Sequence, residues 1–350
     1  MMHKIIHPID KILIVGTGTM AKKHLDIIRK SLPDSQIFLY SEREKSNFSI
    51  PALANGLFYT AQEAIRFDPQ VTVIANAASH HLHITNKLAC LNSHFLIEKP
   101  LTDSPDKILQ IDKNLQHKNR IIQIGYNLRF SDVLVKFKEL ISHKLLGSIL
   151  SVRSEVGQYL PDWRPAIDYR DSVSAQKALG GGALLELSHE LDYLRWIFGD
   201  CESLSAYVNR ASALEVDVED QAILKMKLKD FWGAKNHSYI ATLHMDFYRR
   251  DPVRKCTVIG SKATLTVDQL KGEICLFHEN SWESLFKNEC SLQETYLKQW
   301  NSFVECIQYN KQPRVSLEDA AEVIWMIETA KKSHAKNSIF ISLPSFGVKN

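Results

Sequence analysis

The sequence predicts an α/β protein with two domains: a parallel sheet with crossover helices, then an α+β domain with a large open, mostly antiparallel sheet. Before Gly125, short β-rich apolar runs alternate with helical patterns, as in a parallel sheet. Beyond about residue 200, alternating segments follow one another without long helices between them, which is typical of an antiparallel or mixed sheet. We therefore place the first domain at residues 1–126 and the second at 127–350.

Five apolar runs predict the strands of the first domain: Ile12–Val15, Ile37–Tyr40, Val71–Ala75, Phe95–Ile97 and Ile121–Ile124. The first helix begins near Met20 and ends by Leu32, before Pro33. A later helix is expected to open at Ser104, because a capping serine followed by Pro105 is typical of a first helical turn.

The second domain is predicted to open with a helix over about Asp132–His143, a strand near Ile149–Val156 and a polar aromatic loop. A helix follows the glycine triplet at 180–182. Alternation then predicts five strands: Leu204–Val208, Ala222–Leu228, Tyr239–Met245, Cys256–Ile259 and Ala263–Val267. Two final helices are expected to pack back on the body, at Glu294–Tyr309 and Leu317–Ser333.

Composition excludes several classes of function. Lys and Arg number 43 against 40 Asp and Glu, and the net charge of +3 is spread along the chain, which argues against nucleic acid as a partner. The six cysteines form no Cys-x-x-Cys pair, so neither a zinc site nor a disulfide framework is indicated. No segment is apolar and long enough to span a bilayer, and we expect a soluble, cytoplasmic protein.

A glycine turn, Gly16-x-Gly18-x-x-Ala21, follows the first strand and opens the first helix. This is the context that a dinucleotide-binding motif requires, because Gly16 allows the tight turn and Gly18 lets the backbone approach a pyrophosphate. Small Ala21 permits close helix-to-strand packing. Thr19 and Met20 then lie at the helix N-terminus, which faces the phosphates.

The end of the second predicted strand bears on the choice between NAD and NADP. An acidic side chain there binds the ribose hydroxyls and repels a 2′-phosphate. If Ser41 holds this position, its hydroxyl and Arg43 suit the phosphate of NADP; if Glu42 does, NAD is favoured. Both cofactors remain open, and of the two we expect NADP.

The segment Ala75-Asn76 follows the next strand, where a loop can run under the ribose and nicotinamide. His80 lies just beyond it, and together with His81 and His83 it invites interpretation as a metal site. Adjacent histidines at the start of a helix diverge, and no carboxylate or cysteine joins them nearby. We expect surface or cofactor-edge histidines and no metal.

Glu98-Lys99-Pro100 ends the fourth apolar run, so Lys99 lies just past the carboxyl end of a strand, where a parallel sheet holds its ligand. A lysine that is partly desolvated beside a cationic nicotinamide is suited to general acid–base work near neutral pH. The plain alternative is a surface lysine paired with Glu98.

Behind the glycine triplet, the predicted helix carries an apolar stripe that includes Leu187, Leu191 and Leu194. An adjacent polar face is formed by Glu186, His189, Glu190 and Tyr193. Three preceding glycines allow a ligand or backbone to approach closely, which favours a cleft wall over a solvated face.

These features resemble the Gfo/Idh/MocA oxidoreductases, nicotinamide-dependent enzymes with a Rossmann domain that act mainly on sugars, cyclitols and their derivatives. The resemblance covers nearly the whole chain. It rests on the glycine turn, Glu98-Lys99-Pro100, the segment Gly125–Phe130, the glycine triplet with His189 and Asp192, and the segment Ile259–Ala263.

The resemblance implies that Lys99 is the catalytic lysine and that His189 is the active-site histidine. It places Asn127 and Arg129 near the nicotinamide or the substrate. The family's commoner pattern has an aspartate four residues before the histidine, where this chain has Leu185; Glu186, three residues before, is the acid that can substitute.

The polar aromatic loop is where this family makes substrate contacts. Trp163 can stack on a sugar face, and Arg164 can pair with a carboxylate or phosphate. Tyr193 is expected to help orient the substrate. The arrangement resembles members associated with nucleotide-sugar or surface-polysaccharide pathways.

We therefore expect a secondary alcohol of a sugar-type substrate to lose hydride to the nicotinamide while Lys99, with His189, takes the hydroxyl proton. Three alternatives remain: redox-neutral glycoside cleavage assisted by a retained cofactor, a non-catalytic dinucleotide sensor, and reduction of a non-sugar carbonyl or imine. One sheet face without helices predicts a homodimer or homotetramer.

Overall fold

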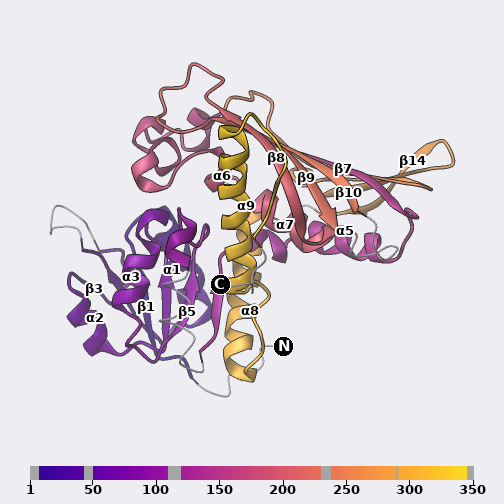
Figure 1. Ribbon diagram of the computed structural model, residues 1–350. Helices are drawn as coiled ribbons and strands as arrows, with labels where there is room; N and C mark the ends of the chain where they lie inside the picture. The colour runs from indigo at the N-terminus through magenta and orange to yellow at the C-terminus, as the bar shows by residue number, and fades with distance from the viewer. Residues whose placement is uncertain (1–7, 43–49, 109–119, 230–237, 289–290, 345–350) are drawn as a thin grey trace. The chain divides into compact units, whose positions relative to one another are not determined.

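The computed structural model describes residues 8–42, 50–108, 120–229, 238–288 and 291–344 (Figure 1). The chain divides into two compact units, and each is treated by itself below. The first unit comprises Met1–Tyr126 with Tyr296–Ala321, and the second comprises Asn127–Thr295 with Glu322–Asn350.

The first unit contains a six-stranded parallel sheet in the order β3-β2-β1-β4-β5-β6. Its strands are β1 (Lys11–Val15), β2 (Gln36–Tyr40), β3 (Gly56–Phe58), β4 (Val71–Ile74), β5 (His94–Ile97) and β6 (Ile122–Ile124). This is the doubly wound order of the dinucleotide-binding fold, in which ligands bind at the carboxyl ends of the strands. The predicted Rossmann fold is confirmed.

The helices of the first unit are α1 (Thr19–Ser31), α2 (Ala61–Phe67), α3 (His81–Lys87) and α8 (Leu292–Tyr309), which begins just before the unit's second segment. Helix α1 buries Leu25 and Ile28, one turn apart, in the core around β1. Trp300 and Phe303 of α8 join the same core cluster. The sequence interpretation assigned this helix to the second domain; its large apolar side chains group it with the first unit instead.

The second unit contains a nine-stranded sheet in the order β14-β13-β12-β11-β7-β10-β9-β8-β15. Its strands are β7 (Ile149–Gly157), β8 (Cys201–Asn209), β9 (Gln221–Lys229), β10 (Ser238–Asp246), β11 (Val253–Gly260), β12 (Thr264–Asp268), β13 (Glu273–His278), β14 (Ser281–Lys287) and β15 (Ile341–Ser342). All neighbouring strands pair antiparallel except β7 and β10, which are parallel. The predicted open, mostly antiparallel sheet is confirmed.

Burial alternates along the central strands of this sheet. Along β10, Tyr239, Ala241 and Leu243 are buried, whereas Ile240 and His244 between and beyond them are exposed. The helices with residues in this unit are α5 (Asp132–Ser142), α6 (Ala183–Glu186), α7 (His189–Phe198) and α9 (Leu317–Ala335), and α5 and α7 lie along one side of the sheet (Figure 1).

Two helix predictions differ from the structure. The single helix expected after the glycine triplet is two helices, α6 and α7, separated at Leu187 and Ser188. At Ser104 the described chain forms a 3₁₀ turn over Pro105–Lys107, and residues 109–119 lie outside the described part. Strands β3, β13, β14 and β15 were not predicted from the sequence, and β3 and β15 are too short to give an alternating pattern.

Candidate functional site

Gly16 occupies the turn between β1 and α1, with φ of 115°. Its backbone N–H donates to the carbonyl of Tyr40 at 2.8 Å. A Cβ atom added there would lie 2.8 Å from the carbonyl oxygen of Ala75, the residue after β4. Both the positive φ and the close backbone contact require glycine, so Gly16 is explained by the fold itself.

Gly18 is the N-cap of α1 and differs from Gly16 in both respects. Its backbone is extended (φ −79°, ψ −171°), which any residue can adopt, and a Cβ atom added there would meet nothing within 4 Å. The protein's own packing therefore gives no reason for glycine at this position. Gly18 caps the helix whose first turn holds Thr19 and Met20, and a helix terminus attracts a phosphate. The space that is open at Gly18 therefore fits the pyrophosphate of a dinucleotide.

The turn after β4 supplies further polar atoms to the same edge of the sheet. The side-chain oxygens of Asn76 and Ser79 are shielded from solvent and have no hydrogen-bond partner within the described chain. Ala75 is buried, and His80 is exposed. Because buried polar atoms in native proteins are almost always paired, the two oxygens suit the hydroxyl or amide groups of a cofactor. The residues present thus fit a nicotinamide dinucleotide.

Glu42 follows β2 and is held by neighbouring side chains. The hydroxyl of Tyr40 donates to its Oε1 at 2.8 Å, and Nζ of Lys87 on α3 lies 2.5 Å from the same oxygen. The hydrogen bond from Lys87 lowers the pKa of Glu42 below its ordinary value, although burial opposes this. Ser41 donates its backbone N–H to Phe58, and Arg43 lies outside the described residues.

Lys99 follows β5 and is partly buried, between buried Glu98 and buried Pro100. Oε1 of Glu98 lies 2.6 Å from Nε2 of His24 on α1. Burial alone raises the pKa of Glu98, but the hydrogen bond and charge of His24 outweigh it, so the pKa lies below its ordinary value. The sequence alternative of an exposed lysine paired with Glu98 does not describe this arrangement, because the carboxylate is internal and bound to His24.

Two buried histidines near Lys99, His24 and His81, were not recognised from the sequence as contacts of its neighbours. His81 was expected at the surface or the cofactor edge, but it is 1% exposed. Its Nδ1 lies 2.9 Å from the Pro100 carbonyl and its Nε2 lies 3.1 Å from the Asn76 carbonyl. A pattern could have indicated His24, since it shares the buried face of α1 with Ala21 and Leu25; the sequence offers no such signal for His81.

In the second unit, the glycine triplet is explained by internal packing. A Cβ atom on Gly181 would lie 2.3 Å from the carbonyl oxygen of Val173, and one on Gly182 would lie 2.5 Å from Oε1 of Glu219. Gly182 also has φ of 108°. Glu219 accepts a hydrogen bond from the backbone N–H of Leu184, in the first turn of α6. Of the two alternatives that the sequence allowed, a ligand or backbone close to these glycines, the structure shows backbone at Gly181, and at Gly182 it shows the Glu219 side chain.

Glu186 and His189 lie on either side of the break between α6 and α7. Oε2 of Glu186 accepts a hydrogen bond from the Ser174 hydroxyl at 2.9 Å. Glu186 is half-buried, and His189 is 9% exposed as the first residue of α7. These two predicted catalytic residues belong to the second unit, whereas Lys99 belongs to the first.

Arg129 is buried and is held by an internal ion pair. Its guanidinium forms a bidentate pair with Asp192 of α7, at 3.0 Å from Nε to Oδ2 and 2.7 Å from Nη2 to Oδ1. Nearby Asn127 is 1% exposed and donates from Nδ2 to the Thr295 hydroxyl at 2.6 Å, while its Oδ1 has no partner within the described chain. Asn127 keeps an acceptor for a ligand; Arg129 stabilises the second unit.

Tyr193 is fully buried, and its hydroxyl pairs with the hydroxyl of Ser154 on β7 at 2.7 Å. Neighbouring Glu190 is also fully buried and accepts from Nε of Arg254 on β11 at 2.8 Å. Two of the four residues of the polar face expected to be a cleft wall, Glu190 and Tyr193, thus pack on the sheet, because their side chains find internal partners there. The expectation that Tyr193 contacts substrate is corrected to a packing role.

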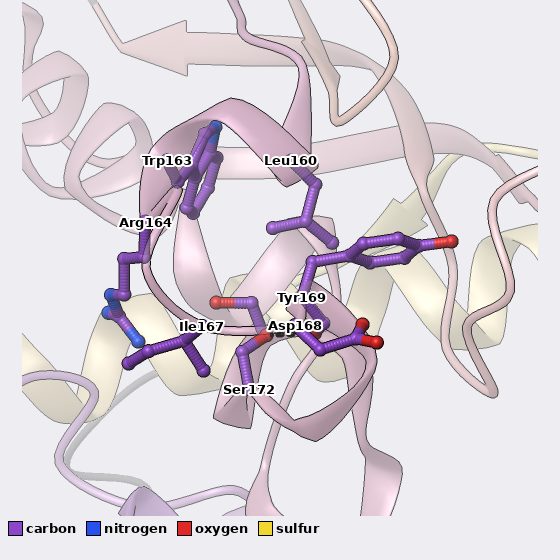
Figure 2. Close-up of a pocket in the computed structure, with 8 residues that line it drawn as sticks. Leu160, Trp163, Arg164, Ile167, Asp168, Tyr169 and Ser172 are labelled. Atoms are coloured by element: carbon purple, nitrogen blue, oxygen red, sulfur yellow. Dashed lines mark hydrogen bonds between the residues drawn. The ribbon is translucent and has the colours of Figure 1, made fainter.

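A small pocket of the second unit includes the predicted substrate residues Trp163 and Arg164 (Figure 2). Its wall combines apolar and polar side chains from one bend of the chain: Leu160, Trp163, Arg164, Ile167, Asp168, Tyr169, Ser172 and Ser174. The ring of Trp163 packs edge-on against Phe247, with centroids 5.2 Å apart. Ser174 connects the pocket to Glu186 through the hydrogen bond described above.

In the part of the chain that the structure describes, no group of three or more His, Cys, Asp or Glu side chains is arranged to hold a metal ion. None of the helices in the same described residues combines the length and apolar character that crossing a bilayer requires. The five cysteines within the described ranges are free thiols.

Comparison with known proteins gives matches in both halves of the chain. The family model described as "Oxidoreductase family, NAD-binding Rossmann fold" of the Gfo/Idh/MocA group matches residues 11–126. The model of the Gfo/Idh/MocA C-terminal domain matches residues 134–266. The two matches together cover most of the chain.

Two relatives illustrate the extent of the likeness. An uncharacterized oxidoreductase of Synechocystis sp. is 26% identical over 219 residues, which are 61% of this chain and 58% of that protein. The chain thus spans little more than half the length of this relative. Myo-inositol 2-dehydrogenase of Thermotoga maritima is 20% identical over 338 residues, covering 92% of this chain and 96% of that protein.

Solved structures show the same fold. A levoglucosan dehydrogenase in complex with NADH and levoglucosan superposes with a TM-score of 0.82 at 17% identity, covering 96% of this chain and 99% of that chain. Together, the family matches, the strand order of the first unit and the glycine turn show that the chain belongs to the Gfo/Idh/MocA family of oxidoreductases, with an NAD-binding Rossmann domain followed by the family's C-terminal domain.

Proposed function

We propose that this protein is an NAD-dependent dehydrogenase that interconverts a secondary alcohol and a ketone on a sugar, a cyclitol or a nucleotide-sugar derivative. One observation carries the proposal: β1, β4 and β5 are neighbours, and their carboxyl ends are followed by the glycine turn, Asn76 and Lys99. In an open parallel sheet this edge binds the ligand. A cofactor space and a candidate proton carrier thus share one edge.

The first unit's residues have separate roles in holding the dinucleotide. The backbone at Gly18 and the start of α1 would bind the pyrophosphate, since the space over Gly18 is open. The unpaired oxygens of Asn76 and Ser79 would bind polar groups of the ribose or nicotinamide. When bound, the nicotinamide supplies the carbon that accepts or returns hydride.

We favour NAD over NADP because of Glu42. Tyr40 and Lys87 fix its carboxylate, and its pKa is lowered chiefly by the hydrogen bond from Lys87, so it is ionised at neutral pH. A fixed carboxylate at the end of β2 accepts the ribose hydroxyls and repels a 2′-phosphate. This proposal differs from the preference for NADP that the sequence analysis drew from Ser41 and Arg43.

Proton transfer is assigned to Lys99. In the oxidation it takes the proton of the reacting hydroxyl, and in the reduction it returns that proton to the carbonyl oxygen. His189 takes part in the same transfer, the role that the family resemblance implies for it, and Glu186 orients the substrate. Arg129 and Tyr193 are left out of the reacting groups because both are committed to internal partners.

The substrate class follows from the second unit and from the named relatives. The bend that forms the pocket carries the ring of Trp163 and the guanidinium of Arg164, residue types that suit a substrate with a sugar ring and an anionic group. Relatives named for inositol and levoglucosan act on polyhydroxylated rings. We assign the pocket to the part of the substrate that does not react.

The exposed face of the nine-stranded sheet supports self-association. On this face Ile240 and Thr242 of β10 lie beside Ser151 and Arg153 of β7 in the strand register. A broad sheet face without covering helices is normally buried against another layer. We propose a homodimer or homotetramer that uses this face, and light scattering on the purified protein at several concentrations would test it.

The proposed function is tested first by calorimetric titration with NAD⁺ and NADP⁺, then by a screen of inositols, anhydrosugars, hexoses and UDP-sugars. The readout of the screen is the absorbance of reduced nicotinamide. We expect NAD⁺ to bind, one substrate class to reduce it, and Lys99→Met to lower turnover about 100-fold or more with unchanged NAD⁺ affinity. A folded protein that binds neither dinucleotide would refute the proposal, as would full turnover in Lys99→Met.

A further inference from the structure

Lys99 lies between two residues that are each bound by a buried histidine of the first unit. On one side, Glu98 accepts a hydrogen bond from His24 of α1 at 2.6 Å. On the other side, the Pro100 carbonyl lies 2.9 Å from Nδ1 of His81 on α3. The exposed fractions of both imidazole residues are 1%.

We propose that His24 and His81 are positioning residues for Lys99, with His24 fixing the residue before the lysine and His81 fixing the residue after it. This inference rests on the proposed function, in which Lys99 carries the proton. Neither histidine touches the reacting atoms; each acts on the lysine through a neighbour in the chain.

In the contact between His24 and Glu98, the donor can be assigned and the carboxylate has a defined place. The lowered pKa of Glu98 makes its carboxylate ionised and therefore an acceptor only, so Nε2 of His24 carries the donated hydrogen. The second oxygen, Oε2, accepts from the backbone N–H of Lys99 at 3.3 Å. A Cβ atom on Gly125 would lie 3.0 Å from that same oxygen, so Gly125 leaves room for the carboxylate. One buried group thus connects α1 to the Lys99 backbone.

The His81 contact links Lys99 to the cofactor turn. Its Nε2 lies 3.1 Å from the carbonyl of Asn76, whose side-chain oxygen is one of the unpaired atoms at the cofactor edge. Both partners of His81 are carbonyl acceptors, and burial lowers the pKa of the ring, so the neutral imidazole donates its one N–H to one of them. The ring still lies between the turns after β4 and β5 and contacts both of them. A ligand that orders Asn76 would therefore act on the Pro100 turn through this ring.

These contacts start on elements that would hold the dinucleotide. His24 lies on α1, whose first turn borders the open space at Gly18, and His81 bonds to Asn76. The two buried histidines thus connect Lys99 to elements that border the cofactor space. We expect NAD⁺ to change the surroundings of Lys99 in the wild-type protein, and this change to be lost when either histidine is replaced by a side chain without a hydrogen-bond donor.

The test compares His24→Leu and His81→Phe, which remove the hydrogen bonds, with His24→Gln and His81→Gln, which keep a donor. His143→Gln is the control, since His143 is an exposed histidine of the second unit. Lysines are reductively methylated with ¹³C-formaldehyde, which keeps their charge. Lys99 is identified by the NMR signal that Lys99→Arg lacks, and this signal is followed with and without NAD⁺.

We expect His24→Leu and His81→Phe to shift the Lys99 signal and to abolish its response to NAD⁺, with intermediate behaviour in the glutamine variants. On an identified substrate, kcat should fall about 10–100-fold while the Kd for NAD⁺ stays within about twofold, as expected for a misplaced catalytic group. If a leucine or phenylalanine variant does not fold, the Lys99 signal and kcat of the corresponding glutamine variant test the inference instead. An unchanged Lys99 signal and NAD⁺ response in every folded histidine variant would overturn the inference.

The outcome is separable from that of the proposed function. If the wild-type protein binds NAD⁺ and its Lys99 signal depends on the two histidines, but no polyol or sugar is oxidised, the positioning role stands and the proposed substrate class fails. If a substrate is oxidised and the histidine variants retain the wild-type signal and kcat, the proposed function stands and the positioning role fails.

Discussion

Arg129 and Asp192 form a bidentate ion pair inside the second unit, with exposed side-chain fractions of 3% and 0%. Arg129 follows β6 by five residues, in the 3₁₀ turn Asn127–Phe130, and Asp192 lies in the first turn of α7. The pair therefore fixes the turn that opens the second unit against the helix that begins at His189.

Removing one member of this pair is predicted to lower the free energy of unfolding by more than removing both members. Arg129→Leu leaves the Asp192 carboxylate buried without its partner, which should lower the free energy of unfolding by about 3–5 kcal/mol. Arg129→Leu combined with Asp192→Leu should lose less than the sum of the two single variants. Urea unfolding of all four proteins checks this, and strictly additive losses would contradict the coupling.

The two glycines of the turn after β1 are predicted to fail in different ways. Gly16→Ala places a Cβ atom against the Ala75 carbonyl at a positive φ, which should cost about 1–3 kcal/mol or more of stability. Gly18→Ala meets no protein atom, so its stability should change by less than about 1 kcal/mol.

Gly18→Ala should nevertheless weaken NAD⁺ binding about tenfold or more, which corresponds to about 1.4 kcal/mol, because the methyl group enters the space assigned to the pyrophosphate. Thermal unfolding and calorimetric titration of the pair separate the two effects. Wild-type NAD⁺ affinity in Gly18→Ala would place the cofactor elsewhere.

The fold of the first unit could be predicted because its signals are local. The strands are runs of apolar β-branched residues, and Gly16 and Gly18 stand between a strand and a helix. The polar residues of α7 could not be interpreted in the same way. The local sequence does not show whether Glu190 and Tyr193 face solvent or are paired inside the protein. Their partners, Arg254 and Ser154, lie far away in the chain.

The supports of Lys99 illustrate the same limit. Lys99 itself could be found from the strand that precedes it, since position at the end of a strand is a local property. The role of His81 could not be predicted, because it depends on contacts with the backbone carbonyls of Asn76 and Pro100. Every residue has such a carbonyl, so the sequence does not show which of them a histidine contacts. His24 was within reach, as a polar residue on the buried face of α1.

The cofactor preference is predicted to depend on Glu42. Glu42→Gln removes the fixed negative charge at the end of β2 while keeping a group that can bond to Tyr40. We expect the ratio of NADP⁺ affinity to NAD⁺ affinity to rise about tenfold, because repulsion of a 2′-phosphate is relieved. Lys87→Met is the matched variant, since it removes the positive charge that pairs with Glu42. It should lower the affinity for NADP⁺ below that of the wild-type protein.

Both affinities can be measured by calorimetry at one ionic strength, because charge effects on an exposed site depend on salt. Equal responses of NAD⁺ and NADP⁺ to Glu42→Gln would show that Glu42 does not contact the adenosine ribose. In that case Ser41 would be the residue to vary next.

Glu98 is predicted to make stability depend on pH. Its ordinary pKa is 4.5; burial alone would raise this, but the hydrogen bond and charge of His24 lower the folded-state pKa below it. The unfolded chain then binds more protons at this position than the folded chain in the window below about pH 4.5, so stability present above that value is lost as pH falls towards the folded-state pKa.

The measurement is urea unfolding of wild type and Glu98→Gln at neutral pH and at steps down through pH 4.5. The glutamine variant should be less stable at neutral pH, because it lacks the ionised partner of His24, and the difference between the two proteins should close as the pH falls. Other carboxylates titrate in both proteins, so their effects cancel in the difference to first order. A gap that stays constant across this range would mean that folding does not lower the pKa of Glu98. A gap that widens as the pH falls would mean that Glu98 is protonated in the folded protein, and the direction of the His24 hydrogen bond would then have to be reversed.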